Sequence, residues 1–292
     1  MISRLNLRSA WMAGFLLSVI PFTSGQALAL TRAQVATDSG GHLVKVDGSV
    51  VLVEPDIELS LLTAGGLREP RKEWSDAARQ LFPAQVHAQL AGKAVELKPD
   101  YDLADDLDPA SQLGQIVRLN EAVAMSITQY SVPGSALATK KDARGRPRMD
   151  WSLGPGVAAL REATGADYAM FTYVRDSYAS GGRTALRIFG ILAGAAMGYA
   201  LDIGGGSQVG VSTLVDLRTG QVVWYNLLAN QSGDLRNADG AEQTAQRMLR
   251  ALPAHGGAPL PATPSPLGLP GQRAAPPAPT APEPAPSPEP TP

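Results

Sequence analysis

The alternation of apolar and polar positions predicts a group of strands in the second half of the chain. Residues 168–178 form a long run rich in aromatic and branched side chains, which is typical of a central strand. Residues 208–217 place apolar side chains at alternate positions, and residues 221–228 return after the turn at Arg218-Thr219-Gly220. This order predicts a buried strand followed by an antiparallel hairpin.

Shorter strand signals occupy the first hundred residues. Residues 43–46 and 49–53 flank Asp47-Gly48, a dipeptide that favours a two-residue turn, so they predict a hairpin. The folded part is accordingly expected to begin near His42. The other predicted strands of this region are residues 57–62 and 94–97.

Four segments repeat apolar side chains at the three- and four-residue spacing of a helix. Asp108 is expected to cap the second, and Gly165 can take the left-handed conformation that ends the third. Pro83 lies inside the first and predicts a kink or a break. The predicted helices are residues 70–91, 109–127, 152–164 and 241–252, with Pro70 and Ser152 starting the first and third. Together, strands and helices predict an α/β fold in which helices sandwich a mixed β-sheet in a single domain.

The sequence patterns at the two ends of the chain differ from this one, and they limit the domain to residues 30–252. Residues 1–29 join a basic start, an apolar core and the small residues around Leu28, which is typical of a signal peptide cleaved after Ala29. Residues 253–292 hold 15 of the 24 prolines, so they predict a disordered Pro-rich tail. The chain has no cysteine, so an exported form has to be held together by its core alone.

The end of the third predicted helix and the hairpin carry a family resemblance. Residues 164–169 read TGADYA, and residues 210–224 read GVSTLVDLRTGQVVW. Residues 150–252 thereby resemble a group of bacterial envelope lipoproteins that includes curli-export subunits, activators of penicillin-binding proteins and the N-terminal domain of TolB. They look most similar to uncharacterised members of that group. The resemblance implies a compact α/β sandwich that binds envelope proteins or oligomerises without catalysis, although the lipid-bearing cysteine is absent here.

Residues 188–201 are uncharged and carry glycine at every fourth position. On a helix Gly190, Gly194 and Gly198 share one face, where another backbone can approach closely. A helix of this length is about 21 Å long, which is shorter than the hydrocarbon core of a membrane. Three alternatives stay open: packing against the protein's own sheet, self-association, and insertion into a membrane as part of an oligomer.

A second candidate contact is the polar segment between the second and third predicted helices. Its basic residues could meet an anionic partner, such as lipopolysaccharide phosphate or an acidic protein, or could form a solvated loop. The net charge of −2 for the whole chain argues against binding to nucleic acid. The basic residues are Lys140, Lys141, Arg144, Arg146 and Arg148.

Residues that support catalysis or metal binding are sparse. The three histidines, His42, His87 and His255, have no metal-ligand spacing, and the acids of residues 100–108 lack the Gly and Glu of a calcium loop. Ser207 lacks the second glycine of a nucleophile elbow. Two carboxylate pairs keep a hydrolase as the last alternative: Glu162 with Asp167, and Asp176 with Asp216. We therefore predict no catalytic, cofactor-binding or metal-binding residues.

These patterns predict a non-catalytic interaction or assembly factor of the bacterial cell envelope, located in the periplasm. Its expected partners are other envelope proteins or further copies of itself, with possible contact to the outer membrane through residues 188–201. The alternative is a membrane-associated oligomer that takes part in export across the outer membrane.

Overall fold

The computed structural model describes residues 30–253 except for residues 39–40, 94, 105, 132–135, 143, 197–205 and 231. The predicted signal peptide, the Pro-rich tail after Pro253 and Gly198 lie outside the described residues.

The described residues form an eight-stranded mixed sheet centred on β6 (Tyr168–Ala179). On one side of β6 the strands are antiparallel: β7 (Gln208–Asp216) pairs with β6, and β8 (Val222–Ala229) pairs with β7. β1 (Leu30–Val35) pairs antiparallel with β8. The long central strand and the hairpin after it are therefore confirmed.

On its other side β6 pairs with parallel strands. β2 (Ser49–Leu52) lies along the first residues of β6, and β3 (Asp56–Leu62) lies along its last residues. β5 (Glu96–Leu97) pairs parallel with β2, and β4 (Arg68–Pro70) pairs antiparallel with β3. The twelve residues of β6 thus give one continuous edge to two shorter strands in succession.

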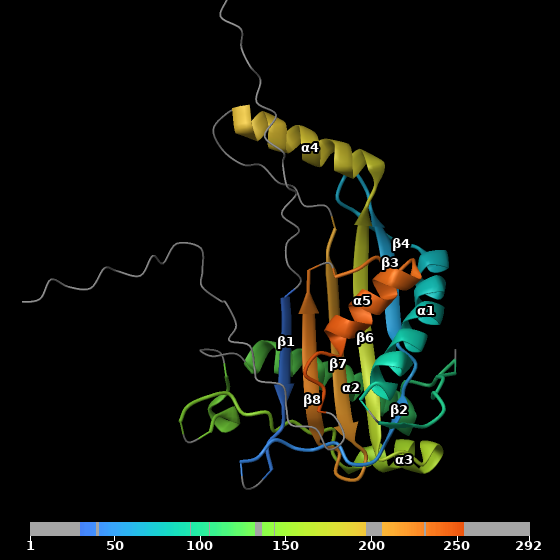
Figure 1. Ribbon diagram of the computed structural model, residues 1–292, viewed down its shortest axis with the longest axis vertical. Coiled ribbons are helices and arrows are strands. Elements are labelled where there is room, and N and C mark those ends of the chain that lie inside the picture. Colours follow the sequence, from blue (N-terminus) through green and yellow to red (C-terminus); the bar gives the residue numbers. More distant parts are fainter. Residues whose placement is uncertain are drawn as a thin grey trace, which may run out of the picture. The chain divides into compact units, whose positions relative to one another are not determined.

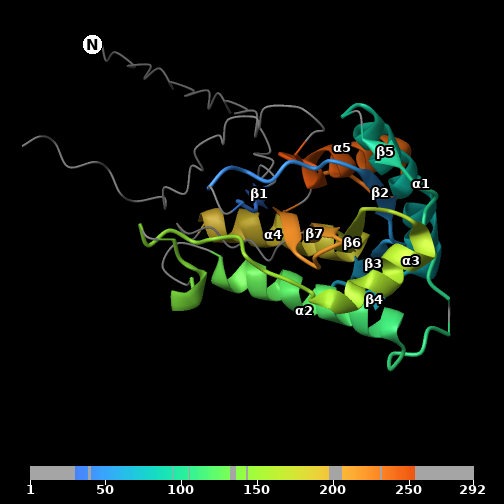
Figure 2. The same ribbon diagram turned by 90° about the horizontal axis from the view of Figure 1, so that it is seen from below.

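Helices cover both faces of the sheet (Figures 1 and 2). α1 (Lys72–Ala91) and α5 (Ala238–Met248) pack on one face, and α2 (Gln112–Tyr130) and α3 (Ala158–Thr164) pack on the other. α4 (Gly181–Ala196) follows β6 and lies past the end of the sheet (Figure 1). The predicted α/β fold, a mixed sheet sandwiched by helices in a single domain, is confirmed.

Each face of the sheet has its own apolar core because successive side chains of a strand point to opposite faces. Tyr168 and Met170 of β6 belong to the core beneath α1 and α5, whereas Ala169 and Phe171 belong to the core beneath α2 and α3. A strand buried on both faces reads as a nearly continuous apolar run, which is the pattern that predicted β6.

The predicted hairpin of residues 43–53 is wrong. β2 pairs with β6 and β5, while Leu43 makes only an isolated bridge to Thr37. Gly48 does have a positive φ of 139°, but a Cβ there would lie 2.5 Å from the carboxylate of Asp167. The glycine therefore serves a close approach to the start of β6 and not a two-residue turn.

The starts of all four predicted helices also differ from the prediction, and α5 covers Ala238–Met248 where residues 241–252 were expected. α1 runs without a break through Pro83 and starts at Lys72, so Pro70 lies in β4. Phe82 and Val86 are fully buried on either side of this proline, and their packing outweighs the lost hydrogen bond. The cap of α2 is Ser111, whose hydroxyl accepts a hydrogen bond from the Gly114 amide.

Ser152 does not cap α3. Its hydroxyl donates to the Gly220 carbonyl, and a short 3-10 turn at Pro155–Val157 precedes α3. The left-handed end of α3 at Gly165 is confirmed, with φ of 64°.

Candidate functional site

α4 leaves the sandwich at the end of β6. The Ser180 hydroxyl accepts a hydrogen bond from the Arg183 amide at 3.1 Å, and this starts the helix. Beyond this turn two apolar side chains are in contact with solvent: Leu186 is 47% exposed and Ile188 is 55% exposed. These two residues are about 200° apart around the helix, so solvent reaches more than one side of α4.

The structure places the predicted glycine stripe on this helix only in part. Gly190 and Gly194 lie in α4, and Gly198 lies outside the described residues. Among the described helices, none is long and apolar enough to cross a membrane.

Hydrogen bonds join the end of β6 to the residue just before β7, on either side of α4 in the sequence. The Ser177 amide donates to the Ser207 carbonyl at 2.9 Å, and the Ser207 amide donates to the Ser177 hydroxyl at 3.0 Å. Arg68 donates to the Ser207 hydroxyl at 3.0 Å. These contacts give Ser207 a structural role at the point where the chain re-enters the sheet.

A buried carboxyl lies on β6 next to these hydrogen bonds. Asp176 is only 3% exposed, and its Oδ2 accepts hydrogen bonds from the Tyr178 hydroxyl at 2.6 Å and the Gln208 amide at 2.8 Å. Its Oδ1 has no hydrogen-bond partner within the described part of the chain. Burial raises the pKa of Asp176 to about 6, and the two hydrogen bonds only partly oppose this rise.

Of the two candidate carboxylate pairs, Asp176 and Asp216 lie far apart along the sheet. Asp216 lies opposite Tyr168 in the β6–β7 ladder, while Asp176 lies opposite Gln208. Eight residues of strand separate the two positions, which is about 26 Å. Asp167 is held by the Ser49 amide at 3.1 Å, and Glu162 lies on the exposed side of α3.

Metal ligands do not gather in the described residues, where no group of three His, Asp or Glu side chains could hold an ion. His42 is exposed beside Asp38, and His87 lies 2.7 Å from Asp100. His255 lies outside the described residues.

Three of the five basic residues predicted to meet an anionic partner form ion pairs with acidic side chains of their own loop. Lys140 bonds to Asp150 and stacks over the Trp151 ring, and Arg148 pairs with the same carboxylate. Arg146 forms an ion pair with Asp142 at 2.8 Å. Lys141 and Arg144 are exposed, and within the described residues neither forms an ion pair.

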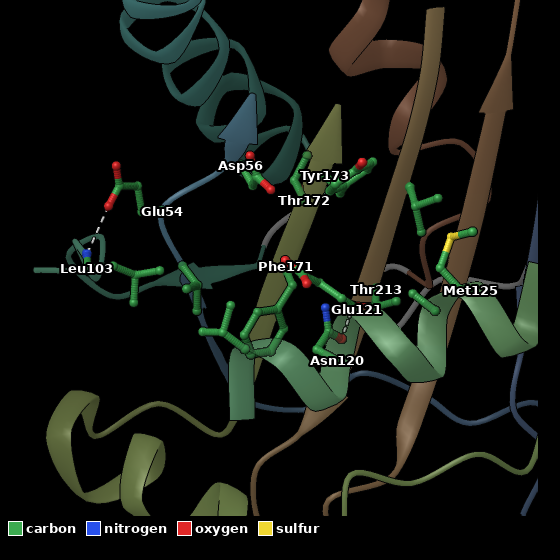
Figure 3. A pocket seen from close by; sticks show the side chains of 14 residues that line it. Glu54, Asp56, Leu103, Asn120, Glu121, Met125, Phe171, Thr172, Tyr173 and Thr213 are labelled. Atoms are coloured by element: carbon green, nitrogen blue, oxygen red, sulfur yellow. Dashed lines mark hydrogen bonds between the residues drawn. The ribbon is translucent and has the colours of Figure 1, made fainter. Parts of the chain in front are cut away.

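A pocket of about 270 Å³ opens between α2 and the face formed by β6 and β7 (Figure 3). Its floor carries Asn120, whose Oδ1 accepts a hydrogen bond from the Thr213 hydroxyl at 2.7 Å. Carboxylates lie near its rim: Glu54 accepts a hydrogen bond from the Leu103 amide, and Asp56 pairs with both terminal nitrogens of Arg175 at 2.8 and 2.9 Å. Apolar side chains form most of the wall, namely Val53, Leu103, Val117, Ala124, Phe171 and Val211.

Glu121 is the third carboxylate of this rim. Within the described part of the chain it has no hydrogen bond or ion pair. Partial burial raises the pKa of Glu121, and the negative charge of Asp56 adds to the rise while Arg175 and Arg118 oppose it. The sequence did not predict this pocket, because Val117, Asn120 and Ala124 follow a helical stripe that is typical of ordinary core packing.

Comparison with known proteins leaves the family open. No family model and no curated protein matches the chain. Among solved structures, the chain is similar to the PelC dodecamer from Paraburkholderia phytofirmans, with 12% identity and a TM-score of 0.32 over 78% of this chain and 99% of that one. A dodecamer of a PelC variant from the same organism gives 13% identity and the same TM-score of 0.32. Similarity at this level assigns neither an activity nor an assembly to this chain.

Proposed function

We propose that this protein is a non-catalytic assembly protein of the bacterial cell envelope and that copies of it associate through α4. The observation that carries the proposal is the exposure of Leu186 and Ile188 on a helix that lies past the end of the sandwich (Figure 1). A helix with apolar side chains on more than one side is normally buried. In the sequence, residues 188–201 contain no charged side chain, so the uncharged character of this segment continues beyond these two residues.

In this proposal, a second copy of the chain buries the exposed apolar side chains of α4. Small residues on one face of a helix let a neighbouring helix approach closely, and α4 offers Gly190 and Gly194 at a spacing of four. A helix over the uncharged residues 188–201 would be about 21 Å long, which is short of a membrane span, so the proposal takes helix-to-helix contact as the reason for their apolar character. The envelope location rests on the predicted signal peptide and on the family resemblance of residues 150–252.

Size-exclusion chromatography with light scattering tests this function. The wild-type protein is expected to be oligomeric, and Leu186→Glu is expected to be a monomer because a charge would lie in the contact. Leu119→Glu is the matched control: Leu119 is 42% exposed on α2, a level similar to that of Leu186, so its oligomer should persist. Gly194→Leu should also weaken association, because a larger side chain separates the helices.

Membrane fractionation separates this proposal from the export alternative. If the folded wild-type protein is a monomer in size-exclusion chromatography, association through α4 is contradicted. Recovery of the wild type with outer membranes, lost in Leu186→Glu, would replace the self-assembly proposal with membrane contact by the same helix.

A further inference from the structure

The pocket beneath α2 combines an apolar interior with a rim carboxylate that forms no direct ion pair within the described residues. Six apolar side chains from α2, β6, β7 and the adjoining loops line it, and Met125, 62% exposed, lies on the same helix at its mouth. A volume of about 270 Å³ approaches the lower end of pockets that hold small organic ligands. Apolar walls of this kind remove an apolar body from water, which is the main source of affinity in such sites.

The floor of the pocket offers a hydrogen-bond donor that the protein does not use. Asn120 is only 7% exposed, and its carbonyl oxygen is engaged by Thr213. Within the described residues, its amide nitrogen has no hydrogen-bond partner, and it points into the pocket (Figure 3). A donor that faces the pocket without a protein partner can be engaged by a ligand that brings an acceptor oxygen to it.

The carboxylates at the rim determine which sign of charge on a ligand is favoured. Arg175 forms two hydrogen bonds with Asp56, whereas Glu121 makes no direct hydrogen bond or ion pair within the described residues and feels Arg175 and Arg118 only at longer range. Glu54 receives only the backbone amide of Leu103. An anion at this rim would meet like charges, while a cation would gain a charge-assisted contact.

We propose that this pocket binds a small organic cation, with the ammonium group beside Glu121, an apolar body between α2 and the sheet, and an acceptor oxygen at the Asn120 amide. Nothing in this site depends on α4, so the inference stands apart from the proposed assembly function. Each part of the ligand is matched by one observed part of the pocket: rim, wall and floor.

Isothermal titration calorimetry of the purified protein with three compounds that share a phenyl ring on a four-carbon chain tests the charge. The compounds are 4-phenylbutylamine, 4-phenylbutanol and 4-phenylbutanoate. The amine should bind about tenfold more tightly than the alcohol, a difference of about 1.4 kcal/mol, and the carboxylate should bind most weakly. A methoxy group at the far end of the amine's ring should tighten binding further, because it brings an acceptor to Asn120.

Variants locate the site. Glu121→Gln should remove the preference for the amine over the alcohol while leaving the alcohol's affinity unchanged. Glu73→Gln is the matched control, because Glu73 is an exposed glutamate in the first turn of α1 on the opposite face of the sheet. Ala124→Leu should weaken all the compounds by filling the pocket, with circular dichroism confirming that the variant is folded.

Two results overturn the proposal. One is equal binding of the three compounds, or no binding of the amine, by the wild-type protein. The other is an amine preference that survives in Glu121→Gln. Because Glu121 lies on the exposed side of α2, the Gln variant is expected to fold normally, and the test does not depend on Ala124→Leu.

Discussion

The carboxyl of Asp176 couples folding to pH. Its pKa is raised to about 6 by burial, so the folded state holds this proton more tightly than the unfolded chain does. The free energy of unfolding should therefore fall by about 3 kcal/mol in total as pH rises from about 3, below the unfolded-state pKa, to about 7, above the folded-state pKa, and this contribution should then stay level. Asp176→Asn should remove this slope, because an amide oxygen can still accept hydrogen bonds from Tyr178 and Gln208 without carrying charge.

Urea unfolding across this pH range measures the effect. Asp102→Asn, at an exposed position, is the control and should keep the wild-type slope. A slope that is the same in Asp176→Asn and in the wild type would show that another group causes the pH dependence.

Gly220 shows a different constraint at the same scale. Its φ is 75°, and a Cβ there would lie 2.1 Å from the carbonyl oxygen of Gly154. Gly220→Ala should therefore lower the free energy of unfolding by at least about 2 kcal/mol, since the hairpin end has to move. Gly145→Ala is the comparison: its φ is 73° and nothing lies within 4 Å, so only the smaller backbone penalty applies. Similar losses in the two variants, measured by urea unfolding, would contradict the close packing at Gly220.

At the scale of elements, Ser111 caps α2 in the structure, whereas the sequence pattern predicted Asp108 as the cap. Ser111→Ala should lower the free energy of unfolding by about 1 kcal/mol, because the Gly114 amide loses its partner. Asp108→Ala should cost less, since that carboxylate accepts only from the Ala110 amide in the preceding turn. A larger loss in Asp108→Ala, in thermal unfolding, would restore Asp108 as the cap.

Local signals predicted the elements, and long-range pairing decided what the sequence could not predict. The hairpin of β7 and β8 could be predicted because its partners are adjacent in sequence. β1 was missed because residues 30–35 are only weakly apolar and pair with β8, with Leu30 opposite Ala229. The wrong hairpin at residues 43–53 has the same origin, since the true neighbours of β2 lie more than forty residues away in β5 and more than a hundred away in β6.

The same reasoning applies to the candidate sites. The glycine spacing identified α4 as an unusual segment, because that signal lies within one helix. The pocket could not be predicted, since Glu54, Asn120, Phe171 and Thr213 come from four distant parts of the chain. The basic loop could be recognised, but its pairing with Asp142 and Asp150 depends on how the loop closes on itself.

At the scale of the whole molecule, association through α4 makes stability depend on protein concentration. If the apolar side chains of α4 are buried only between copies, association stabilises the folded state by mass action. The melting temperature of the wild type should then rise steadily over a hundredfold increase in concentration. In Leu186→Glu it should be constant and equal to the wild-type value extrapolated to low concentration, because the sandwich itself is unchanged. Leu119→Glu should keep the wild-type dependence. A wild-type melting temperature that does not vary with concentration would mean that α4 contributes nothing to association.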